Sequence, residues 1–430
     1  MMVTMLRNRW KPERIRYLFS ERNEKGHPNA EPLAATQHAG VVPKSLLDFK
    51  TMEAVTSDLG IFKLVEPGDF VISLRSFEGG LEYSAYRGIL SPAYTVLRPS
   101  ANVYAGFFKH LLKSDWFVQG LAKHKKGIRD GQAVPFATLQ DDYLGVPPRE
   151  EQERIANFLD EKTTRIDALI SEKEALLVSL NEHQYSYASH LICRGMEPGA
   201  TLQTTSFPEI SEIPKHWSVK RLKFLGEVRS GIAKGKDHGE KDTVHLPYLR
   251  MANVQDGYVD LTEVLEIEVG THEVERFLLK RGDVLMNEGG DNDKLGRGTV
   301  WQGQIEPCVH QNHVFAVRLF DTSLAEWVAR FTSTDAARTY FFLRSKQSTN
   351  LASINQTNVR ELPIPMPPEK EREAILDEVR RSASATEQLI AHVREHIDRL
   401  REYRSSIISA AVTGQLDINA YQASGEVAVV

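Results

Sequence analysis

The chain has 430 residues and a mass of 48.5 kDa, which excludes a single small domain. Hydrophobic residues make up 41% and charged residues 26%, which excludes wholesale disorder and fibrous repeats. A net charge of −5 argues at first sight against a nucleic-acid partner. The two cysteines, Cys193 and Cys308, lie far apart in the sequence, so a disulfide framework is excluded.

The first segment, residues 1–146, has no stretch near the ~20 apolar residues of a membrane span, and neither has the rest of the chain. Its start lacks the apolar region of a secretory signal, so we expect a soluble, cytoplasmic protein. Short β-type runs such as Asp69–Ser73 and Thr95–Leu97 surround a helical stretch, Ala105–Leu112. This mixture predicts an α+β domain.

A long helix is predicted next, in residues 147–196. It begins after Pro147-Pro148, carries acids in its first turn where the helix dipole favours them, and stops near Gly195. At ~1.5 Å per residue, a helix of about 40 residues is a rod of roughly 60 Å.

The second half of the chain repeats this plan. WKPERIRYLF from Trp10 matches WSVKRLKFLG from Trp217 at an offset of 207, and a Gly-Asp pair recurs at an offset of 214. PPREEQERI from Pro147 matches PPEKEREAI from Pro367 at an offset of 220. We therefore expect a second α+β domain in residues 197–366, with β-type runs Val284–Met286 and Val314–Leu319 and a helical stretch Leu324–Arg330. A second long helix with a tail follows in residues 367–430.

Both predicted helices carry apolar heptads over four or more repeats, which favours a coiled-coil seam. Periodicity alone also allows a long amphipathic helix lying on a globular core. The duplication favours pairing, because two helices of equal length and pattern are natural partners. The predicted seam consists of Leu159, Ile166, Leu169, Leu176, Leu180, Tyr187, Val379, Leu389, Val393, Leu400 and Ile407.

The net charge is distributed unevenly over these segments. Residues 1–146 carry 19 basic and 15 acidic residues, a net charge of +4, whereas residues 147–196, 197–366 and 367–430 each carry −3. The helical segments therefore more than account for the total of −5, which no longer excludes nucleic acid.

Several polar loops have the composition of nucleic-acid contacts. A basic run with glycines at 123–131 suits a loop that follows phosphates, and NEGGDNDKLGRG from Asn287 suits close backbone approach. Amide and basic side chains elsewhere in the second domain match those that make bidentate base contacts. Each could instead be a solvated, turn or capping residue. The candidate DNA-binding residues are Lys123, Lys125, Lys126, Arg129, Arg250, Asn253, Lys294, Arg297, Gln311, Asn312, Lys346 and Gln347.

Catalytic motifs are missing from the sequence. It contains no GxxxxGK[ST] phosphate loop, no GxSxG elbow, no HExxH and no Asn/Asp-Pro-Pro-aromatic tetrapeptide of the amino-methyltransferases. Cys308, His310 and His313 lie within six residues, but on a strand His313 falls on the other face and no fourth ligand is evident. We expect hydrogen-bonding side chains there, no metal site, and a chain without catalytic residues.

The whole chain resembles the DNA-specificity (S) subunits of type I restriction-modification systems, the HsdS family. The resemblance is carried by GVPPREEQERIANFLD at 145–160 and IPMPPEKEREAILDEV at 364–379. IPKHW at 213–217, HQNHVFAVR at 310–318 and YRSSIISAAVTGQLDI at 403–418 support it.

The resemblance implies two α/β target recognition domains, separated and joined by two long antiparallel helices and related by a pseudo-twofold repeat. Each domain would read one half of a bipartite double-stranded DNA site, and the helices would set the spacer and dock two methyltransferase subunits. S-adenosylmethionine, ATP and Mg2+ would be bound by partner subunits, including the restriction/translocase subunits, and not by this chain. A coiled-coil protein–protein adaptor without sequence-specific DNA reading is the alternative.

Overall fold

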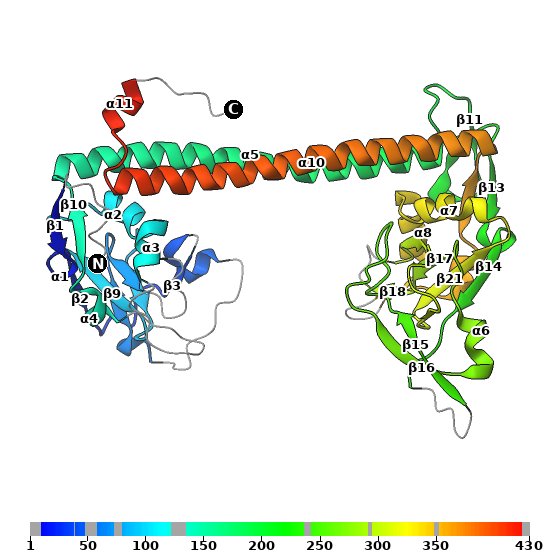
Figure 1. Cartoon of the computed structure of the whole chain (residues 1–430), viewed down its shortest axis with the longest axis horizontal. Coiled ribbons are helices and arrows are strands. Elements are labelled where there is room, and N and C mark those ends of the chain that lie inside the picture. The colour runs from blue at the N-terminus through cyan, green and yellow to red at the C-terminus, as the bar shows by residue number, and fades with distance from the viewer. Residues whose placement is uncertain are drawn as a thin grey trace. The chain divides into compact units, whose positions relative to one another are not determined.

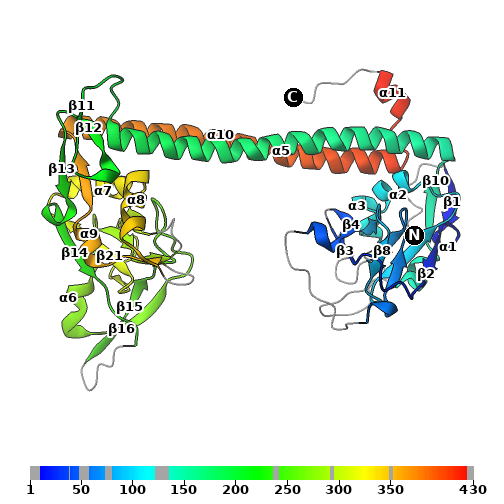
Figure 2. The ribbon, with the colours of Figure 1, turned by 180° about the vertical axis from the view of Figure 1, so that it is seen from behind.

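The computed structural model describes residues 10–37, 39–47, 58–72, 80–121, 135–235, 242–290, 295–347 and 352–423. The chain divides into two units, one of residues 1–174 and 393–430 and one of residues 175–392. Each unit contains an α+β domain and part of both long helices, α5 (Arg149–Arg194) and α10 (Glu369–Val412). Figure 1 shows the elements in chain order, and Figure 2 shows them from behind.

A four-stranded antiparallel sheet in the order β2-β9-β6-β7 forms the centre of unit 1. Two smaller strand pairs, β5-β8 and β3-β4, cover one face, where alternating valines and leucines pack together. The helices cover the opposite face. The strands are β1 (Lys11–Arg14), β2 (Phe19–Arg22), β3 (Leu33–Thr36), β4 (Gly40–Pro43), β5 (Lys63–Val65), β6 (Phe70–Ile72), β7 (Leu81–Tyr83), β8 (Gly88–Leu90), β9 (Thr95–Pro99) and β10 (Tyr143–Val146). The helices are α1 (Ile15–Leu18), α2 (Ala105–Leu111), α3 (Asp115–Leu121) and α4 (Phe136–Leu139).

Unit 2 repeats this sheet in the order β14-β21-β17-β19, which matches unit 1 strand for strand along the sequence. The predicted runs at 69–73, 95–97, 284–286 and 314–319 are confirmed as β6, β9, β17 and β21, and the predicted helical stretches as α2 and α7. The strands are β11 (Leu202–Thr204), β12 (Glu212–Pro214), β13 (Ser218–Arg221), β14 (Gly226–Ser230), β15 (Thr243–Leu249), β16 (Leu265–Gly270), β17 (Val284–Asn287), β18 (Gly289–Gly290), β19 (Gly298–Val300), β20 (Val309–His310), β21 (Val314–Leu319), β22 (Lys346–Gln347), β23 (Ala352–Ser353) and β24 (Pro363–Met366). The helices are α6 (Val274–Phe277), α7 (Ala325–Thr332), α8 (Asp335–Arg344) and α9 (Gln356–Arg360).

The repeated Gly-Asp pair is a structural turn in both units. Gly68 and Gly282 have φ of +97° and +91°, a region that favours glycine. The following carboxylates are buried and accept a backbone N–H three residues earlier, from Glu66 to Asp69 at 2.9 Å and from Lys280 to Asp283 at 2.8 Å. The repeat in the sequence therefore marks the same structural turn in both units.

Each domain is joined to its long helix in the same way. β1 pairs with β10 immediately before α5, and β13 pairs with β24 immediately before α10. α5 and α10 have 46 and 44 residues, and both end before a glycine of positive φ, Gly195 (+79°) or Gly414 (+71°). The predicted helix starts and stops are confirmed.

A buried tryptophan packs against each of these glycines. A Cβ added to Gly414 would lie 3.2 Å from the Trp10 ring, and one added to Gly195 would lie 3.2 Å from the Trp217 ring. The end of α10 therefore completes the core of unit 1 through Ile407 and Ala411. The end of α5 completes the core of unit 2 in the same way.

Within each unit α5 and α10 pack antiparallel, as Figure 2 shows. In unit 1 Arg404 binds Asp167 through two contacts, Nε–Oδ1 at 2.8 Å and Nη2–Oδ2 at 3.2 Å. In unit 2 the Gln184 carbonyl oxygen accepts hydrogen bonds from Ser382 at 3.2 Å and Thr386 at 3.1 Å. Among the described residues, no helix is long and apolar enough to cross a membrane.

Burial divides the predicted seam residues into two groups. Leu159, Ile166, Val379, Val393 and Ile407 are buried, and Leu180, Tyr187 and Leu400 are half-buried. Leu169, Leu176 and Leu389 are 40%, 43% and 47% exposed, so their assignment to the seam is wrong. The neighbouring residues Ile170, Leu177 and Ile390 are more buried and take their place. They lie four residues after the heptad positions 166, 173 and 386, whereas the exposed leucines lie three residues after them.

Candidate nucleic-acid interface

The structure brings the predicted polar residues of the second domain into one loop cluster. Backbone hydrogen bonds connect Gln311 N–H to Leu249 O, Asn312 N–H to Ile232 O, and Glu288 N–H to His313 O. The same set connects Asn287 N–H to Arg297 O and Ile354 N–H to Glu288 O. The segments that follow β14, β15, β17, β20 and β23 therefore meet. We call these segments, residues 230–232, 249–255, 287–290, 295–297, 310–313, 345–347 and 352–354, the unit-2 loop cluster.

Asn253 holds one of these loops in shape. Its Oδ1 accepts the N–H of Arg250 at 2.9 Å, and its Nδ2 donates to the carbonyls of Asp260 at 2.8 Å and Glu263 at 2.9 Å. The side chain is buried, so its amide is used by the backbone. We therefore assign Asn253 a structural role in place of the predicted base contact.

Two arginines of the cluster lie close to this structural core. Arg250 pairs with Glu263 at 2.8 Å, while Arg297 follows the turn that Gly296 makes at a φ of +66°. In the part of the chain that the structure describes, the Nε atoms of both arginines are buried without a hydrogen-bond partner. The Oδ1 atom of buried Asn287 likewise has no hydrogen-bond partner among the described residues, while its Nδ2 donates to Val254 O at 3.0 Å. The cluster thus contains guanidinium donors and an amide acceptor that its own contacts leave unused.

The strand β22 carries the most accessible pair of predicted residues. Lys346 and Gln347 are both exposed, and β22 pairs with β23, which pairs in turn with β18. Gln311 and Asn312 are half-buried where their backbones join two other loops. Lys346 and Gln347 are therefore more accessible than Gln311 and Asn312, and Gln347 Nε2 donates a hydrogen bond to Ser345 Oγ at 2.9 Å.

The side chains of Cys308, His310 and His313, which the sequence places within six residues, make hydrogen bonds as predicted. Cys308 donates to Val309 O, His310 Nδ1 donates to Val314 O at 2.6 Å, and exposed His313 Nδ1 contacts Glu288 Oε2 at 2.5 Å. Burial lowers the pKa of His310 to about 4, so this imidazole is neutral near pH 7. Within the described ranges, no cluster of three or more metal-ligating side chains occurs.

The basic run of the first domain, Lys123, Lys125, Lys126 and Arg129, lies outside the described residues, and so does Lys294. Their assignments as DNA contacts stay predictions. The domain boundaries at residues 146, 196 and 366 also stay predictions.

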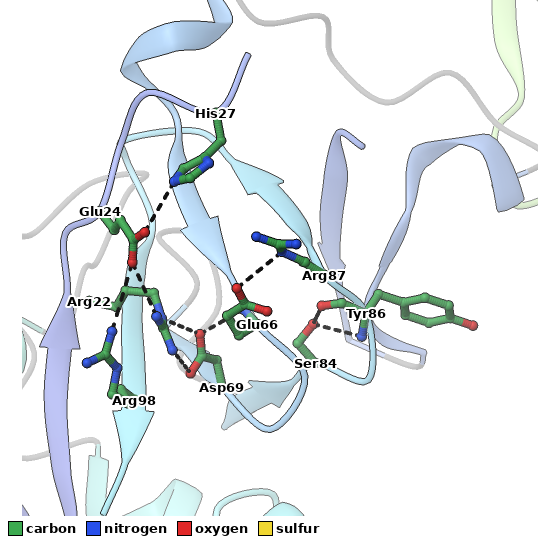
Figure 3. Close-up of polar contacts among 9 residues, drawn as sticks. All are labelled: Arg22, Glu24, His27, Glu66, Asp69, Ser84, Tyr86, Arg87 and Arg98. Atoms are coloured by element: carbon green, nitrogen blue, oxygen red, sulfur yellow. Dashed lines mark hydrogen bonds and ion pairs between the residues drawn. The ribbon is translucent and has the colours of Figure 1, made fainter. Parts of the chain in front are cut away.

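Unit 1 has a cluster of charged residues that the sequence did not single out. Arg22 binds Asp69 through Nε–Oδ2 at 2.7 Å and Nη2–Oδ1 at 3.2 Å, as Figure 3 shows. Glu24 contacts Arg22, His27 and Arg98. Partial burial disfavours the charged form of Arg22, but the ion pair with Asp69 outweighs it and raises the pKa of the guanidinium.

Two arginines of this cluster remain accessible. The side chains of Arg87 and Arg98 are 65% and 53% exposed, and each contacts only one carboxylate at 3.2 Å or more among the ion pairs between described residues. Tyr86, next to Arg87, is also exposed. Their separation in the sequence hid this grouping, because only strand pairing in the fold brings Arg22, Glu66 and Arg98 together.

Comparison with known proteins gives consistent similarities. The chain is 24% identical over 327 residues to the type I restriction enzyme EcoKI specificity subunit of Escherichia coli, covering 75% of this chain and 68% of that protein. It is 22% identical over 326 residues to the StySPI specificity subunit of Salmonella potsdam, covering 74% and 67%. A putative MjaX specificity subunit of Methanocaldococcus jannaschii is 24% identical over 208 residues, or 48% of this chain and 47% of that one. No protein-family model matches the chain.

Solved structures agree in fold. A chain from a structure that addresses complex assembly and conformational transition of the type I restriction-modification system is 16% identical, covers 96% of this chain and 99% of its own, and has a TM-score of 0.68. The HsdS subunit from Thermoanaerobacter tengcongensis is 15% identical, covers 96% and 98%, and has a TM-score of 0.52. The α+β fold with two long packed helices is therefore shared with these chains.

Proposed function

This chain belongs to the specificity subunits of type I restriction-modification systems, and from that premise we propose that its two domains read the two halves of one bipartite DNA site. Specificity subunits are DNA-binding and non-catalytic, and the cofactors in such systems belong to the partner subunits. S-adenosylmethionine, ATP and Mg2+ accordingly have their sites on methyltransferase and restriction subunits under this proposal.

The unit-2 loop cluster is the observation that supports this reading most strongly. Five loops meet there, and they carry an exposed Lys-Gln pair together with the half-buried side chains of Arg250 and Arg297. Guanidinium and amide groups are the side-chain groups that make bidentate contacts with guanine and adenine. Sequence would thus be read by side chains whose loops are fixed by backbone hydrogen bonds.

The net charge of the second domain is negative, so its phosphate contacts have to be local. Lys346 supplies an exposed cation in the unit-2 loop cluster, and Arg87 and Arg98 do so in the charged cluster of unit 1. Phosphate contacts position a protein on DNA, whereas base contacts specify the sequence. We therefore assign phosphate contacts to Lys346, Arg87 and Arg98. We assign base contacts to Arg297 and Gln347.

The exposed leucines of the long helices support the docking of methyltransferase subunits. Leu169 and Leu389 occupy equivalent positions at the offset of 220, and both present an apolar side chain outside the helix seam. Equivalent apolar positions suit two copies of one partner, since the repeat offers each copy a similar surface. The partners proposed for this chain are therefore double-stranded DNA, two methyltransferase subunits and, through the assembled complex, restriction subunits.

A binding assay with the complete chain and its methyltransferase subunits tests DNA reading. In the double variant Arg297→Ala/Gln347→Ala we expect the affinity for the preferred site to fall by roughly 10- to 100-fold and the discrimination at one half-site to relax, while the other half-site is still read. Lys220→Ala, at an exposed position of β13, is the matched control and should retain wild-type affinity. Uniform loss at both half-sites, or no loss, would contradict the assignment.

A further inference from the structure

The edge strand β19 has an outer side that faces a hollow of about 820 Å3. On its inner side it pairs with β17, with Val284 opposite Val300 and Met286 opposite Gly298. Trp301 N–H donates to Asp283 O, and Asn287 N–H donates to Arg297 O. In the segment 297–301, which contains β19, the odd-numbered residues therefore direct their backbone N–H and C=O groups at β17. In an antiparallel pair the backbone N–H and C=O groups of successive residues point alternately toward the partner strand and away from it. The backbone groups of Val300 therefore point away from β17 and into the hollow.

The hollow is a groove with fixed walls. The turn at Gly257–Val259 forms the wall opposite β19, and α7 lies beneath with Ala325 and Ala329. Asp256, at the start of this turn, accepts hydrogen bonds from Ser333 and from Arg338, the latter at 3.1 Å. Gly257 N–H donates to Gly298 O at 3.4 Å and closes one end. Beyond that end, β19 has no second strand partner among the described residues.

Unit 1 shows how the equivalent edge is covered there. β7 occupies the place of β19, with Tyr83 corresponding to Val300, and it is also the last strand of its four-stranded sheet. The chain's own β4 lies along it, because an isolated bridge joins Val41 to Ser84. A Cβ on Gly40 would lie 2.7 Å from Tyr83 O, which shows how closely the two backbones approach. In unit 1 the strand β4 thus lies along this edge, whereas in unit 2 the described chain bonds to it at Gly298, through Gly257, and no strand lies along it at Val300.

The charge of the groove indicates what it would accept. Arg281 and Arg330 line it, and Arg281 is exposed. Among the described residues that line it, Glu326 is the one carboxylate; it forms an ion pair with Arg380 of α10, and its Oε1 lies 3.9 Å from Arg330 Nε. Two lining cations face one carboxylate that already has a partner, so the groove favours an acidic occupant.

We propose that β19 accepts an added strand from an extended, acidic segment of a methyltransferase subunit. This inference rests on the proposed function, since it assumes that methyltransferase subunits dock on the long helices. The contact between Glu326 and Arg380 makes the groove continuous with α10, which supports that partner over others. Main-chain hydrogen bonds to Val300 would give affinity, and Arg281 and Arg330 would select for acidic side chains. Because β4 covers the edge in unit 1, only one of the two docked copies would contribute a strand.

Hydrogen exchange of the assembled complex tests this inference. When methyltransferase is added to the full chain, we expect slower exchange at the amide of Val300 and unchanged exchange at Tyr83. Arg281→Glu/Arg330→Glu should weaken methyltransferase binding about 10-fold, whereas the matched control Lys220→Glu should bind as wild type. Val300→Pro removes the edge N–H without disturbing the β17 ladder, so it should also weaken methyltransferase binding about 10-fold without any change of charge.

The outcomes separate this inference from the proposed function. If the wild-type chain does not bind methyltransferase at all, the docking proposal itself fails. If it binds, but Val300 stays unprotected and the charge-reversed variant binds equally well, only strand addition is overturned. Protection of Val300 by DNA alone, by a second copy of this chain, or in the free chain would also overturn it, because the occupant would then not be a methyltransferase segment.

Discussion

Unit 1 and unit 2 share their apolar frame and differ in their polar contacts. Both have the same strand order, the same Gly-Asp turn and a tryptophan packed on the glycine that ends a long helix. In unit 1 charged pairs such as Arg404 with Asp167 connect the helices, whereas in unit 2 the amide of Gln184 does so. The frame is therefore fixed by packing and glycine geometry, while polar positions are free to change with each unit's task.

The attachment of each domain to the helix that follows it shows this divergence most clearly. In unit 1 the helix contributes the carboxylate Asp160, which contacts Lys109 at 2.8 Å and His110 at 2.6 Å. At the equivalent position 220 residues later the helix contributes a cation, Arg380, and the domain contributes Glu326. The polarity is reversed although the geometry is retained.

The largest effects are expected where the frame itself is broken. Trp10→Ala and Trp217→Ala should each lower the free energy of unfolding of their own unit by about 3–5 kcal/mol, because a buried aromatic ring is lost and a cavity remains. Hydrogen exchange followed separately in the two units measures this. Equal loss of protection in both units from either variant would show that the frame is not repeated as two separate cores.

A neighbouring pair of helix residues distinguishes the seam from the exposed surface. Ile390→Glu should lower the free energy of unfolding by about 3 kcal/mol, since it places a charge in the buried seam. Leu389→Glu should change it by less than about 0.5 kcal/mol, because Leu389 is exposed, while weakening methyltransferase binding. Denaturant unfolding and a binding assay check both, and the reverse order of stabilities would rule out the assigned seam.

Acid should destabilise unit 2 in particular. The pKa of His310 is lowered to about 4 by burial, whereas its unfolded-state pKa is near 6.5, so its contribution is present above about pH 6.5 and is lost as the pH falls toward 4. The offset of 220 places Leu90, a buried leucine, at the equivalent position of unit 1. His310→Leu should therefore flatten the acid dependence of unit 2 in hydrogen exchange between pH 7 and pH 5. Unchanged acid dependence in that variant would exclude His310 as its source.

The smallest effect concerns the helix contacts. Arg404→Gln should cost about 0.5–1 kcal/mol at low salt and less at high salt, because the exposed ion pair with Asp167 is screened. Gln184→Ala should have a similar cost that does not depend on salt, since its hydrogen bonds are uncharged. Denaturant unfolding of both variants at two salt concentrations measures this difference in salt dependence. The same salt dependence for both variants would show that the helix contacts of unit 1 and unit 2 are chemically alike.

The sequence predicted what depends on local pattern. Proline pairs, acidic first turns and terminal glycines placed both long helices, and the repeat predicted two similar domains. The half-wrong seam has a physical reason, because residues three and four positions after Ile166 both lie near the seam and both are apolar. The choice between Leu169 and Ile170 depends on how the partner helix packs, which one chain's periodicity does not contain.

The candidate site was predictable only in part. Residue type identified Arg250, Arg297, Gln311 and Lys346, and the fold brought them into one cluster. Residue type could not show that Asn253 is consumed by its own backbone. It also could not reveal the charged cluster around Asp69, since its members lie on strands that only tertiary pairing makes neighbours.

Mapping of methylated bases in DNA from cells that contain this chain and its methyltransferase tests the central claim most directly. The account predicts one bipartite motif, with two specified halves separated by an unspecified spacer of fixed length. It further predicts that Arg297→Ala/Gln347→Ala relaxes only one half. A continuous motif, or methylation without sequence preference, would contradict the claim that two domains of one chain each read half of the site.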